Sequence, residues 1–280
     1  MNILVTGGAG YIGGYVVRKL RAEGHDVVVV DDLSNSTERT FDLVYRSCDN
    51  VRDEVDVLIH LAGSICVGGD PRELWDNNVG VAIGMLRNVK AKKVIVASSA
   101  AVYEGSPHDL CEEHLTIPES VYGRTKLALE QLVSDLHPGA VALRLFNVAG
   151  GRERHKRETH ILPLALRATE EKPLTLHGNV LSMMRDFVHV EDVANAFVQA
   201  IEWPAGAYNI GTGFQTSVRE LLRCIETVAG PHCMTSGPAR EGDAFRLVAN
   251  IEKAQARGWQ PKHDLESIVR SAWENEKPQV

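Results

Sequence analysis

The chain opens with a hydrophobic strand that breaks on three regularly spaced glycines. Residues 3–5 (Ile-Leu-Val) are followed by a G-x-x-G-x-x-G pattern at Gly7, Gly10 and Gly13. An amphipathic helix is predicted directly afterwards, because apolar residues recur on one helical face. Glycines between a strand and a helix let backbone N–H groups approach a phosphate at the positive end of the helix. The opening therefore predicts a pyrophosphate cradle; the alternative is a glycine-rich turn without a ligand.

An acidic residue stands where such a dinucleotide site requires one. Residues 25–30 form a second hydrophobic run, and Asp31 ends it. A carboxylate at this place binds the ribose hydroxyls of NAD. The next residues, Asp32 to Asn35, include no Arg or Lys that could accept a 2′-phosphate. We therefore predict NAD rather than NADP as the cofactor.

Bulk composition excludes several classes of function. The net charge is −7 and no long basic run occurs, which argues against nucleic acid as a partner. No apolar run approaches the length of a membrane span, so we expect no membrane partner. The first strand begins at the start methionine, so we expect no signal peptide. The five cysteines show no CxxC spacing, which favours neither a zinc site nor a disulfide framework. We expect no metal, and a reducing cytoplasm as the location.

Hydrophobic strands alternate with helical stretches through the first half of the 280 residues. This order predicts an α/β fold with a Rossmann-type doubly wound parallel sheet. From Gly150 onward the elements become short. We expect residues 1–150 to be the NAD-binding domain and residues 151–280 to be a smaller α/β substrate-binding lobe, with some chain crossing between them. The stretch between Asp49 and Asp56 is too short for a crossover helix, so we expect an extended connection there.

Two further patterns supply reactive groups. Ser98 and Ser99 end the strand over residues 93–98, and the carboxyl ends of parallel strands border the ligand; a plain turn serine is the alternative. Tyr122 and Lys126 lie four apart on one face of a predicted helix. A nearby ammonium favours phenolate, so we expect the pKa of Tyr122 to fall toward that of a general base. The alternative is an ordinary pair on a helix surface.

A third pattern concerns the helix predicted from Pro71 to about Lys90. Asn77 and Asn78 stand in its interior, where asparagine is a poor helix former. We therefore expect a polar partner for at least one of these two side chains.

Taken together, these motifs resemble those of the extended short-chain dehydrogenases/reductases. Within that superfamily the chain is similar to the NAD-dependent epimerase/dehydratase family, and most of all to the UDP-glucose (galactose) 4-epimerases. The resemblance runs nearly end to end. It rests on Thr6-Gly-Gly-Ala-Gly-Tyr-Ile-Gly13, Asp31 with Leu33-Ser-Asn-Ser36, His60-Leu-Ala-Gly63, Asp76-Asn-Asn-Val79, Ser98-Ser-Ala-Ala-Val-Tyr103, Tyr122-Gly-Arg-Thr-Lys126, Leu145-Phe-Asn147, Arg185-Asp-Phe-Val-His189 and Arg240-Glu-Gly-Asp243.

The resemblance implies a role for each matching position. The cofactor would be bound by Gly7, Gly10, Tyr11, Ile12, Gly13, Asp31, Asn35, Ser36, Asp49, Asn50, Leu61, Ala62, Gly63 and Asn78. Tyr122 would be the base, Lys126 would bind the nicotinamide ribose, and Ser99 would bond the reacting sugar hydroxyl. The nucleotide diphosphate would meet Asn147, Arg185, Arg240 and Asp243. Arginine suits a pyrophosphate because its planar donors bind in pairs; the alternative for Arg185 is a structural ion pair with Asp186 or Asp192.

Some positions depart from the family pattern and bear on sugar specificity. Ala101 stands where a threonine is frequent, Ile65 where the epimerases have a lysine, and His160 where they have a substrate-contacting asparagine. Leu247 corresponds to a position where a bulky residue limits N-acetylated sugars. We therefore expect UDP-N-acetylhexosamines to be admitted as well.

The implied reaction is 4-epimerisation of a nucleotide sugar, of the UDP-glucose/UDP-galactose type or a uronic or N-acetylated relative. It passes through a transient 4-keto sugar, with NAD regenerated in each turnover. Dehydration is disfavoured, because Ala100 and Ala101 stand where dehydratases carry the acid that elimination requires. A reductase of a 4-keto nucleotide sugar and a non-catalytic NAD-binding regulator stay open. A homodimer through the helices at 71–90 and 121–137 is the expected assembly.

Overall fold

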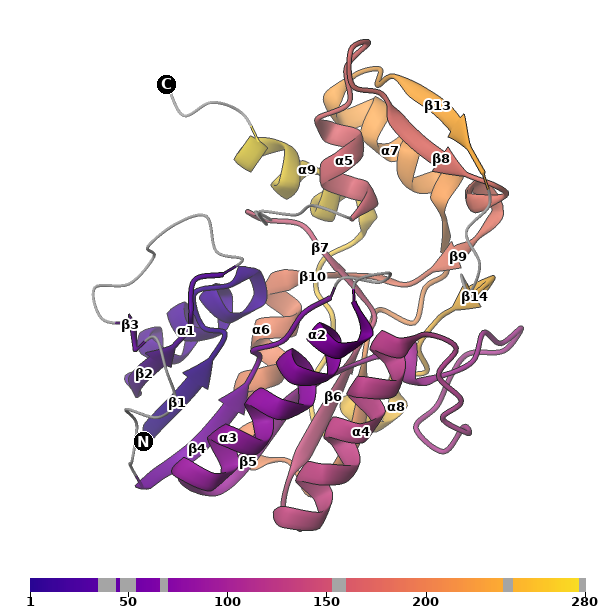
Figure 1. Cartoon of the computed structure of the whole chain (residues 1–280). Helices are drawn as coiled ribbons and strands as arrows, with labels where there is room; N and C mark the ends of the chain where they lie inside the picture. Colours follow the sequence, from indigo (N-terminus) through magenta and orange to yellow (C-terminus); the bar gives the residue numbers. More distant parts are fainter. Residues whose placement is uncertain (35–43, 46–53, 66–69, 153–159, 239–243, 277–280) are drawn as a thin grey trace.

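A computed structural model describes residues 1–34, 44–45, 54–65, 70–152, 160–238 and 244–276. Its centre is a seven-stranded sheet of order β3-β2-β1-β4-β5-β6-β11, in which every pairing is parallel. Figure 1 shows this sheet with helices on both faces and a smaller lobe beyond one edge. The strands are β1 (Asn2–Thr6), β2 (Asp26–Val30), β3 (Val44–Tyr45), β4 (Glu54–His60), β5 (Lys90–Ser99), β6 (Val141–Leu145) and β11 (Gly206–Ile210).

The central strands are apolar on both faces because both faces are covered. Successive side chains point to opposite sides, so Ile3 and Val5 join one core cluster while Leu4 joins the other. The same alternation divides β4, where Ile59 and Leu58 face opposite layers. Two-sided burial explains why these segments read as unbroken hydrophobic runs in the sequence.

Two sets of helices form the outer layers (Figure 1). One face is covered by α1 (Tyr11–Ala22) and α6 (Val190–Gln199), which pack against each other. The other face is covered by α2 (Pro71–Trp75), α3 (Val81–Asn88) and α4 (Val121–Leu136). A π-helical turn at Asp76–Gly80 joins α2 to α3 and packs against α4. The expected α/β fold with a doubly wound parallel sheet is confirmed.

The smaller lobe has a core of its own, which includes Leu162, Phe187, Leu221 and Val269. Its helices are α5 (Ile161–Leu166), α7 (Val218–Ala229) and α9 (Leu265–Glu276). The short strands outside the main sheet are β7 (Asn147–Ala149), β8 (Leu174–His177), β9 (Met184–Arg185), β10 (Phe187–His189), β12 (Thr216–Ser217), β13 (Met234–Gly237) and β14 (Arg246–Leu247). The remaining short helix, α8 (Glu252–Gln255), packs against β11.

The segment between β3 and β4 lies mostly outside the described residues, and the segment after α5 forms a turn. The extended connection predicted between Asp49 and Asp56 falls mostly on residues outside the described part of the chain. The helix α5 ends at Leu166. Thr169 and Lys172 bond each other in a turn, which takes the backbone groups that further helix would use. Within the described ranges, every helix is too short or too polar to cross a bilayer.

Candidate active site

The glycine loop lies between β1 and α1 at the carboxyl edge of the sheet. Gly7 has a φ of 67°, and a Cβ there would stand 2.6 Å from the backbone nitrogen of Ala62. A Cβ on Gly13 would stand 2.1 Å from the carbonyl oxygen of Gly7. Both contacts are too close for any side chain, so glycine is required. Gly10 is the residue that precedes α1, and no side chain caps the helix there. The positive end of α1 is therefore available to an anion.

Asp31 ties the end of β2 to this loop. Its carboxylate accepts hydrogen bonds from Ala9 N (3.0 Å) and Leu33 N (2.8 Å). The pKa of Asp31 is raised, because the effect of burial is larger than the opposing effect of these backbone donors. The four other residues predicted to bind the adenosine part lie outside the described residues: Asn35, Ser36, Asp49 and Asn50.

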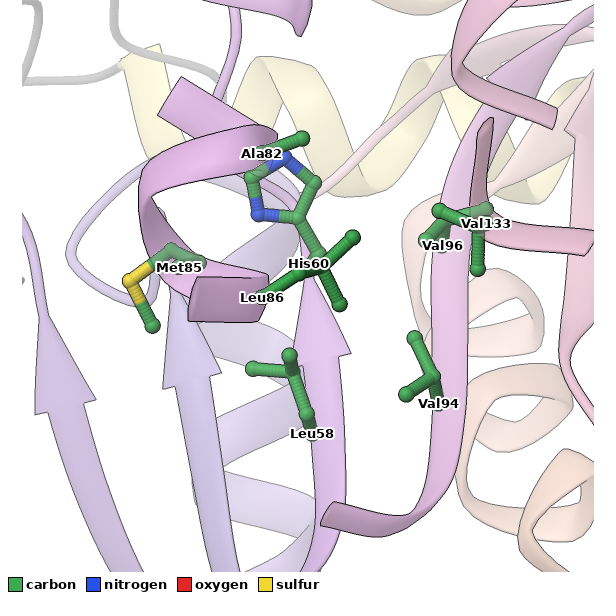
Figure 2. Close-up of a pocket in the computed structure, with 8 residues that line it drawn as sticks. All are labelled: Leu58, His60, Ala82, Met85, Leu86, Val94, Val96 and Val133. Atoms are coloured by element: carbon green, nitrogen blue, oxygen red, sulfur yellow. The ribbon is translucent and has the colours of Figure 1, made fainter. Parts of the chain in front are cut away.

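The end of β4 forms the far wall of the glycine loop. Thr6 Oγ1 lies 2.7 Å from His60 Nδ1 and accepts from Ala62 N at 3.3 Å. Figure 2 shows the His60 ring among apolar side chains, including Met85 and Val96. The space between these side chains has no room for a water molecule. Burial, and then the charge of Lys126, lower the pKa of His60 to about 3, so it is neutral. His60 thus fixes Thr6, and Thr6 fixes the backbone of residues 61–63.

Asn78 lies on the π-helical turn and is fully buried. Its Oδ1 accepts from Ser64 N at 2.7 Å, and its Nδ2 donates to Ser64 O and to Thr125 Oγ1. The extra residue of a π-turn turns this side chain inward, and such turns recur at functional sites. The expected polar partner for one of the two asparagines is confirmed. Asn78 therefore joins the loop after β4 to α4.

The three predicted reacting groups come together at the carboxyl end of β5. Ser99 ends that strand, and Tyr122 and Lys126 lie on the first two turns of α4. Lys126 Nζ donates to Ala97 O at 3.0 Å and stands 5.9 Å from the centre of the Tyr122 ring. A Cβ on Gly63 would stand 3.4 Å from the same Nζ, so the loop after β4 also borders this group. The arrangement can move a proton between a phenol and a bound hydroxyl.

One electrostatic expectation is wrong for the protein alone. The pKa of Tyr122 is raised rather than lowered, because burial of the phenol outweighs its hydrogen bond with Ser99. Lys126 is itself 5% exposed, and burial lowers its pKa to about 8 while the charge of Glu130 opposes that shift. The sequence spacing predicted the pair but not the depth at which it lies.

A buried polar network behind Lys126 was missed by the sequence reasoning. Glu130 lies one turn further along α4 and accepts hydrogen bonds from Ser98 Oγ and from the guanidinium of Arg144. Arg144 also donates to Tyr103 Oη at 2.7 Å. The four-residue spacing from Lys126 to Glu130 is the signal that could have indicated this group.

The structure describes two of the four residues predicted to bind the nucleotide diphosphate of the substrate. Asn147 begins β7, and Arg185 lies on β9 beside Leu247 of β14. Arg185 Nη1 donates to Met184 O at 2.9 Å. Arg240 and Asp243 lie outside the described part of the chain.

The two carboxylates considered as partners of Arg185 are committed to other donors. Asp186 accepts from Thr212 N, Gly213 N and Ala249 N, and from the Thr212 hydroxyl. Asp192 accepts from the backbone of Lys262 and from His263. Asp186 thus anchors the loop after β11 next to Arg185.

Two of the departures from the family pattern, Ala101 and Ile65, follow strands of the main sheet. Ala101 follows Ser99 in a short 3₁₀ turn, and its N–H donates to Ser99 Oγ at 3.2 Å. Ile65 lies in the loop after β4, and His160 precedes α5. A threonine at position 101 would add a hydroxyl one turn from Ser99.

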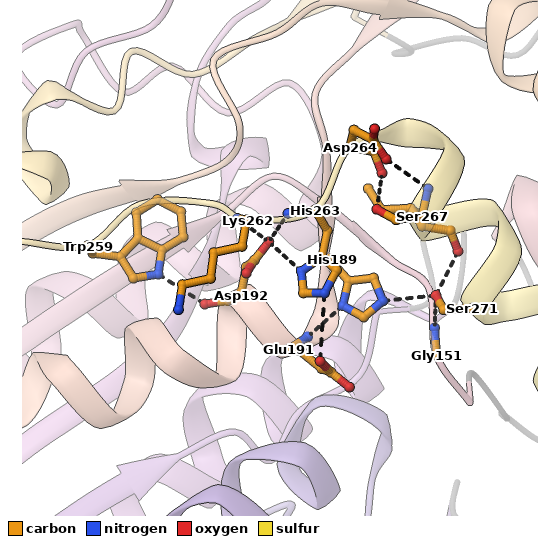
Figure 3. Close-up of polar contacts among 11 residues, drawn as sticks. Gly151, His189, Glu191, Asp192, Trp259, Lys262, His263, Asp264, Ser267 and Ser271 are labelled. Carbon is orange, nitrogen blue, oxygen red and sulfur yellow. Dashed lines mark hydrogen bonds and ion pairs between the residues drawn. The ribbon is translucent and has the colours of Figure 1, made fainter.

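A separate cluster brings His189, Glu191 and His263 together, and Figure 3 shows it with its neighbours. His189 Nδ1 accepts from Glu191 N, and His189 Nε2 lies 2.8 Å from Ser271 Oγ. The two imidazole rings are stacked with centres 4.0 Å apart. Parallel stacked rings cannot both direct a lone pair at one ion, as a metal site requires. The cluster is a hydrogen-bonded clamp between α6 and α9.

Comparison with known proteins agrees with this geometry. Residues 3–211 match the model of the NAD dependent epimerase/dehydratase family. A UDP-glucose 4-epimerase of Rhizobium meliloti is 37% identical over 316 aligned positions, covering 97% of this chain and 96% of the relative. The alignment spans more positions than the 280 residues of this chain, so it opens gaps in this chain.

Solved structures give the same result. A UDP-glucose 4-epimerase from Stenotrophomonas maltophila, with bound NAD and formylated UDP-arabinopyranose, superimposes with a TM-score of 0.89 at 29% identity, covering 98% of this chain and 97% of that one. A UDP-N-acetylglucosamine 4-epimerase from Methanobrevibacter ruminantium has a TM-score of 0.86 at 25% identity, covering 98% of this chain and 97% of that one. The chain belongs to the NAD-dependent epimerase/dehydratase family.

Proposed function

We propose that this chain is an NAD-dependent 4-epimerase of a UDP-sugar. One observation carries the proposal: Ser99, Tyr122 and Lys126 gather at the carboxyl end of β5, beside the glycine loop. Two similar proteins of known structure support it: one holds NAD and formylated UDP-arabinopyranose, and the other holds NAD+ and UDP. The bound sugar would lie over this edge, with the smaller lobe above it.

The residues present fit a dinucleotide. The close contacts at Gly7 and Gly13 leave backbone rather than side chains at the positive end of α1. We assign the pyrophosphate to the backbone of residues 10–13 and to Gly7, and the adenosine ribose to Asp31 with Asn35 and Ser36. Asp49 and Asn50 would meet the adenine. Leu61, Ala62, Gly63 and Asn78 would line the path to the nicotinamide.

The chain's own groups would handle the proton. Tyr122 takes the proton of the C4 hydroxyl and later returns it, Ser99 holds that hydroxyl, and Lys126 stabilises the phenolate and binds the nicotinamide ribose. Bound NAD would supply a hydride acceptor and donor for C4 of the sugar, and the positive charge of its oxidised nicotinamide would favour the phenolate form of Tyr122. Burial raises the pKa of the Tyr122 phenol in the protein alone. We therefore expect cofactor binding to activate this base.

The substrate's nucleotide diphosphate is assigned to Asn147, Arg185, Arg240 and Asp243.

We propose a division into an NAD-binding domain of residues 1–150 and a smaller lobe of residues 151–280. The chain crosses between the two, because β11 returns to the main sheet. Leu247 lies beside Arg185 on the neighbouring strand. It is smaller than an aromatic residue, which supports the admission of N-acetylated sugars at this place.

We also propose a homodimer and a cytoplasmic location. The helices α2, α3 and α4 pack together and carry three exposed large apolar side chains, Trp75, Val81 and Leu136. A second copy of the same helices would cover them. Cys111, Cys224 and Cys233 are free thiols, as a reducing compartment favours.

Proton NMR of the purified protein without added cofactor tests the proposed activity. The protein is mixed separately with UDP-glucose, UDP-galactose, and their N-acetyl and uronic acid relatives. We expect the C4 epimer to appear, since tightly held NAD is regenerated in each turnover. If epimer appears with neither N-acetyl sugar, the proposal for Leu247 is wrong. Turnover only with a keto sugar and added reduced cofactor would replace the epimerase by a reductase, and no turnover in either assay would favour a non-catalytic regulator.

A further inference from the structure

A buried ion pair lies directly behind the candidate reacting groups. Arg144 on β6 binds Glu130 on α4 through two parallel hydrogen bonds, Nε to Oε1 at 3.0 Å and Nη2 to Oε2 at 2.8 Å. The two side chains are 7% and 9% exposed. Two charges removed from water at this depth need a compensating arrangement, and buried pairs are a poor means of adding stability. Their position next to Lys126 therefore calls for another explanation.

Glu130 connects three elements that carry the site. It shares α4 with Tyr122 and Lys126, and it lies one turn beyond Lys126. Its carboxylate accepts from Ser98, whose neighbours in β5 are Ser99 and Ala97. Ala97 O in turn accepts the hydrogen bond of the Lys126 ammonium. One carboxylate thus holds the helix of the base against the strand of the serine.

We propose that Glu130 is a positioning residue of the active site, which keeps Lys126 in its charged form and fixes α4 against β5. The proposal rests on the proposed function, because it assigns to Lys126 the stabilisation of a phenolate. Glu130 itself contacts neither substrate nor cofactor in this assignment. It acts through Lys126 and Ser98.

The electrostatic surroundings of Lys126 support this role. The Lys126 ammonium is nearly inaccessible to water, and the groups around it on β4, the π-helical turn and the loop after β4 are neutral: His60, Asn78 and Ser64. Burial lowers the pKa of Lys126 from 10.5 to about 8, and the negative charge of Glu130 opposes this shift. Arg144 lies on another element, with its charge directed to Glu130 and Tyr103. Glu130 is therefore the anion that supports the ammonium.

The sign of the pH effect follows from this arrangement. Lys126 stabilises the phenolate only while it is protonated, so activity should fall as the pH rises through the pKa of Lys126. Removing the charge of Glu130 lowers that pKa further. The alkaline limb of the rate profile should then move to lower pH, by about one unit for the loss of one nearby opposite charge.

The experiment compares Glu130→Gln with Arg144→Gln in the full-length protein holding its NAD. Each substitution breaks the same buried pair, so both should lower thermal stability. We measure kcat against pH in the epimerase assay, together with KM for the sugar. Glu130→Gln should move the alkaline limb to lower pH by about one unit with little change in KM. Arg144→Gln should leave the limb in place or move it to higher pH.

A purely structural ion pair would give the two variants the same profile, and that result would overturn the proposal. An unchanged limb in Glu130→Gln would do the same. If either single variant does not fold, the double variant Glu130→Gln/Arg144→Gln replaces it, because two amides can bond each other; its limb should lie below that of the wild type. A double variant with a wild-type limb would refute the role of Glu130.

A readout without turnover separates this proposal from the epimerase proposal. The pKa of Lys126 is measured by NMR on protein labelled with carbon-13 at lysine, and its signal is assigned by comparison with Lys126→Met. Glu130→Gln should lower this pKa by about one unit, and Arg144→Gln should not lower it. Inactivity of the wild type with every UDP-sugar would overturn the proposed function alone. An unshifted lysine signal in Glu130→Gln would overturn the present inference alone.

Discussion

At the scale of single residues, burial sets the chemistry of the candidate site. Lys126 and His60 both have lowered pKa values because their charged forms lose water, while the pKa of Tyr122 is raised for the same reason. The sequence predicted which residue types stand here, since Tyr and Lys four apart share a helical face. It did not predict the pKa of the phenol, because solvent exposure depends on elements distant in the chain.

The phenol of Tyr122 can be tested directly. Tyr122→Phe should lower kcat by about 10²- to 10⁴-fold, the usual contribution of a positioned general base, with little effect on KM or bound NAD. Tyr208→Phe is the matched control, because it also removes one hydrogen-bonded tyrosine hydroxyl, which donates to Pro204 O, but it lies on β11 away from the serine. Steady-state kinetics on both variants decide the matter. Equal rates for the two variants would exclude Tyr122 as the base.

At the scale of elements, the π-helical turn shows how a weak sequence signal becomes a defined structure. Two adjacent asparagines interrupt the helix over residues 71–88, and only Asn78 turns inward. Its three hydrogen bonds connect the loop after β4 with α4. The sequence indicated that a polar partner was needed. Only the tertiary structure identifies Ser64 and Thr125 as the partners, because neither is near Asn78 in the chain.

The role of Asn78 can be tested with the adjacent residue Asn77 as the control. Asn78→Ala should lower the free energy of unfolding by about 1–3 kcal/mol, because the half-buried N–H and C=O of Ser64 and the buried hydroxyl of Thr125 lose their partner. Asn77→Ala, at an exposed position on the same turn, should change it by less than about 0.5 kcal/mol. Denaturant unfolding measures both values. Similar losses in the two variants would mean that the turn itself, and not the amide of Asn78, provides the stability.

At the scale of the whole molecule, the chain crosses between its two parts more than once. After β10 it returns to the main sheet, where α6 packs on α1 and β11 pairs with β6. Tyr11 Oη donates to Gly150 O, and Tyr15 Oη accepts from Arg152 N, so α1 is bonded to the segment that leads into the lobe. The dinucleotide and sugar parts of the candidate site are therefore held by one continuous framework.

The proposed dimer is a prediction at this scale. Trp75→Glu would place a charge on the exposed apolar face of these helices, so we expect it to give a monomer by sedimentation while the far-ultraviolet circular dichroism stays unchanged. Leu115→Glu is the control, because Leu115 is 79% exposed on a loop outside these helices. That variant should keep the assembly of the wild type. A monomeric wild type, or a dimer that survives Trp75→Glu, would show that these helices do not form a dimer interface.

Local sequence patterns determined one part of this protein, and contacts between distant segments determined the other. The glycine loop, Asp31 at the end of β2, the tyrosine–lysine pair and the parallel sheet were all determined by local patterns, because backbone conformation and periodic burial act over a few residues. Proximity in the fold decided the rest: Asp31 bonds Ala9, Glu130 bonds Arg144 and Ser98, and Asp186 holds the loop at Thr212. Such contacts join strands and helices far apart in the chain, and only the packed structure brings their charges close enough to interact.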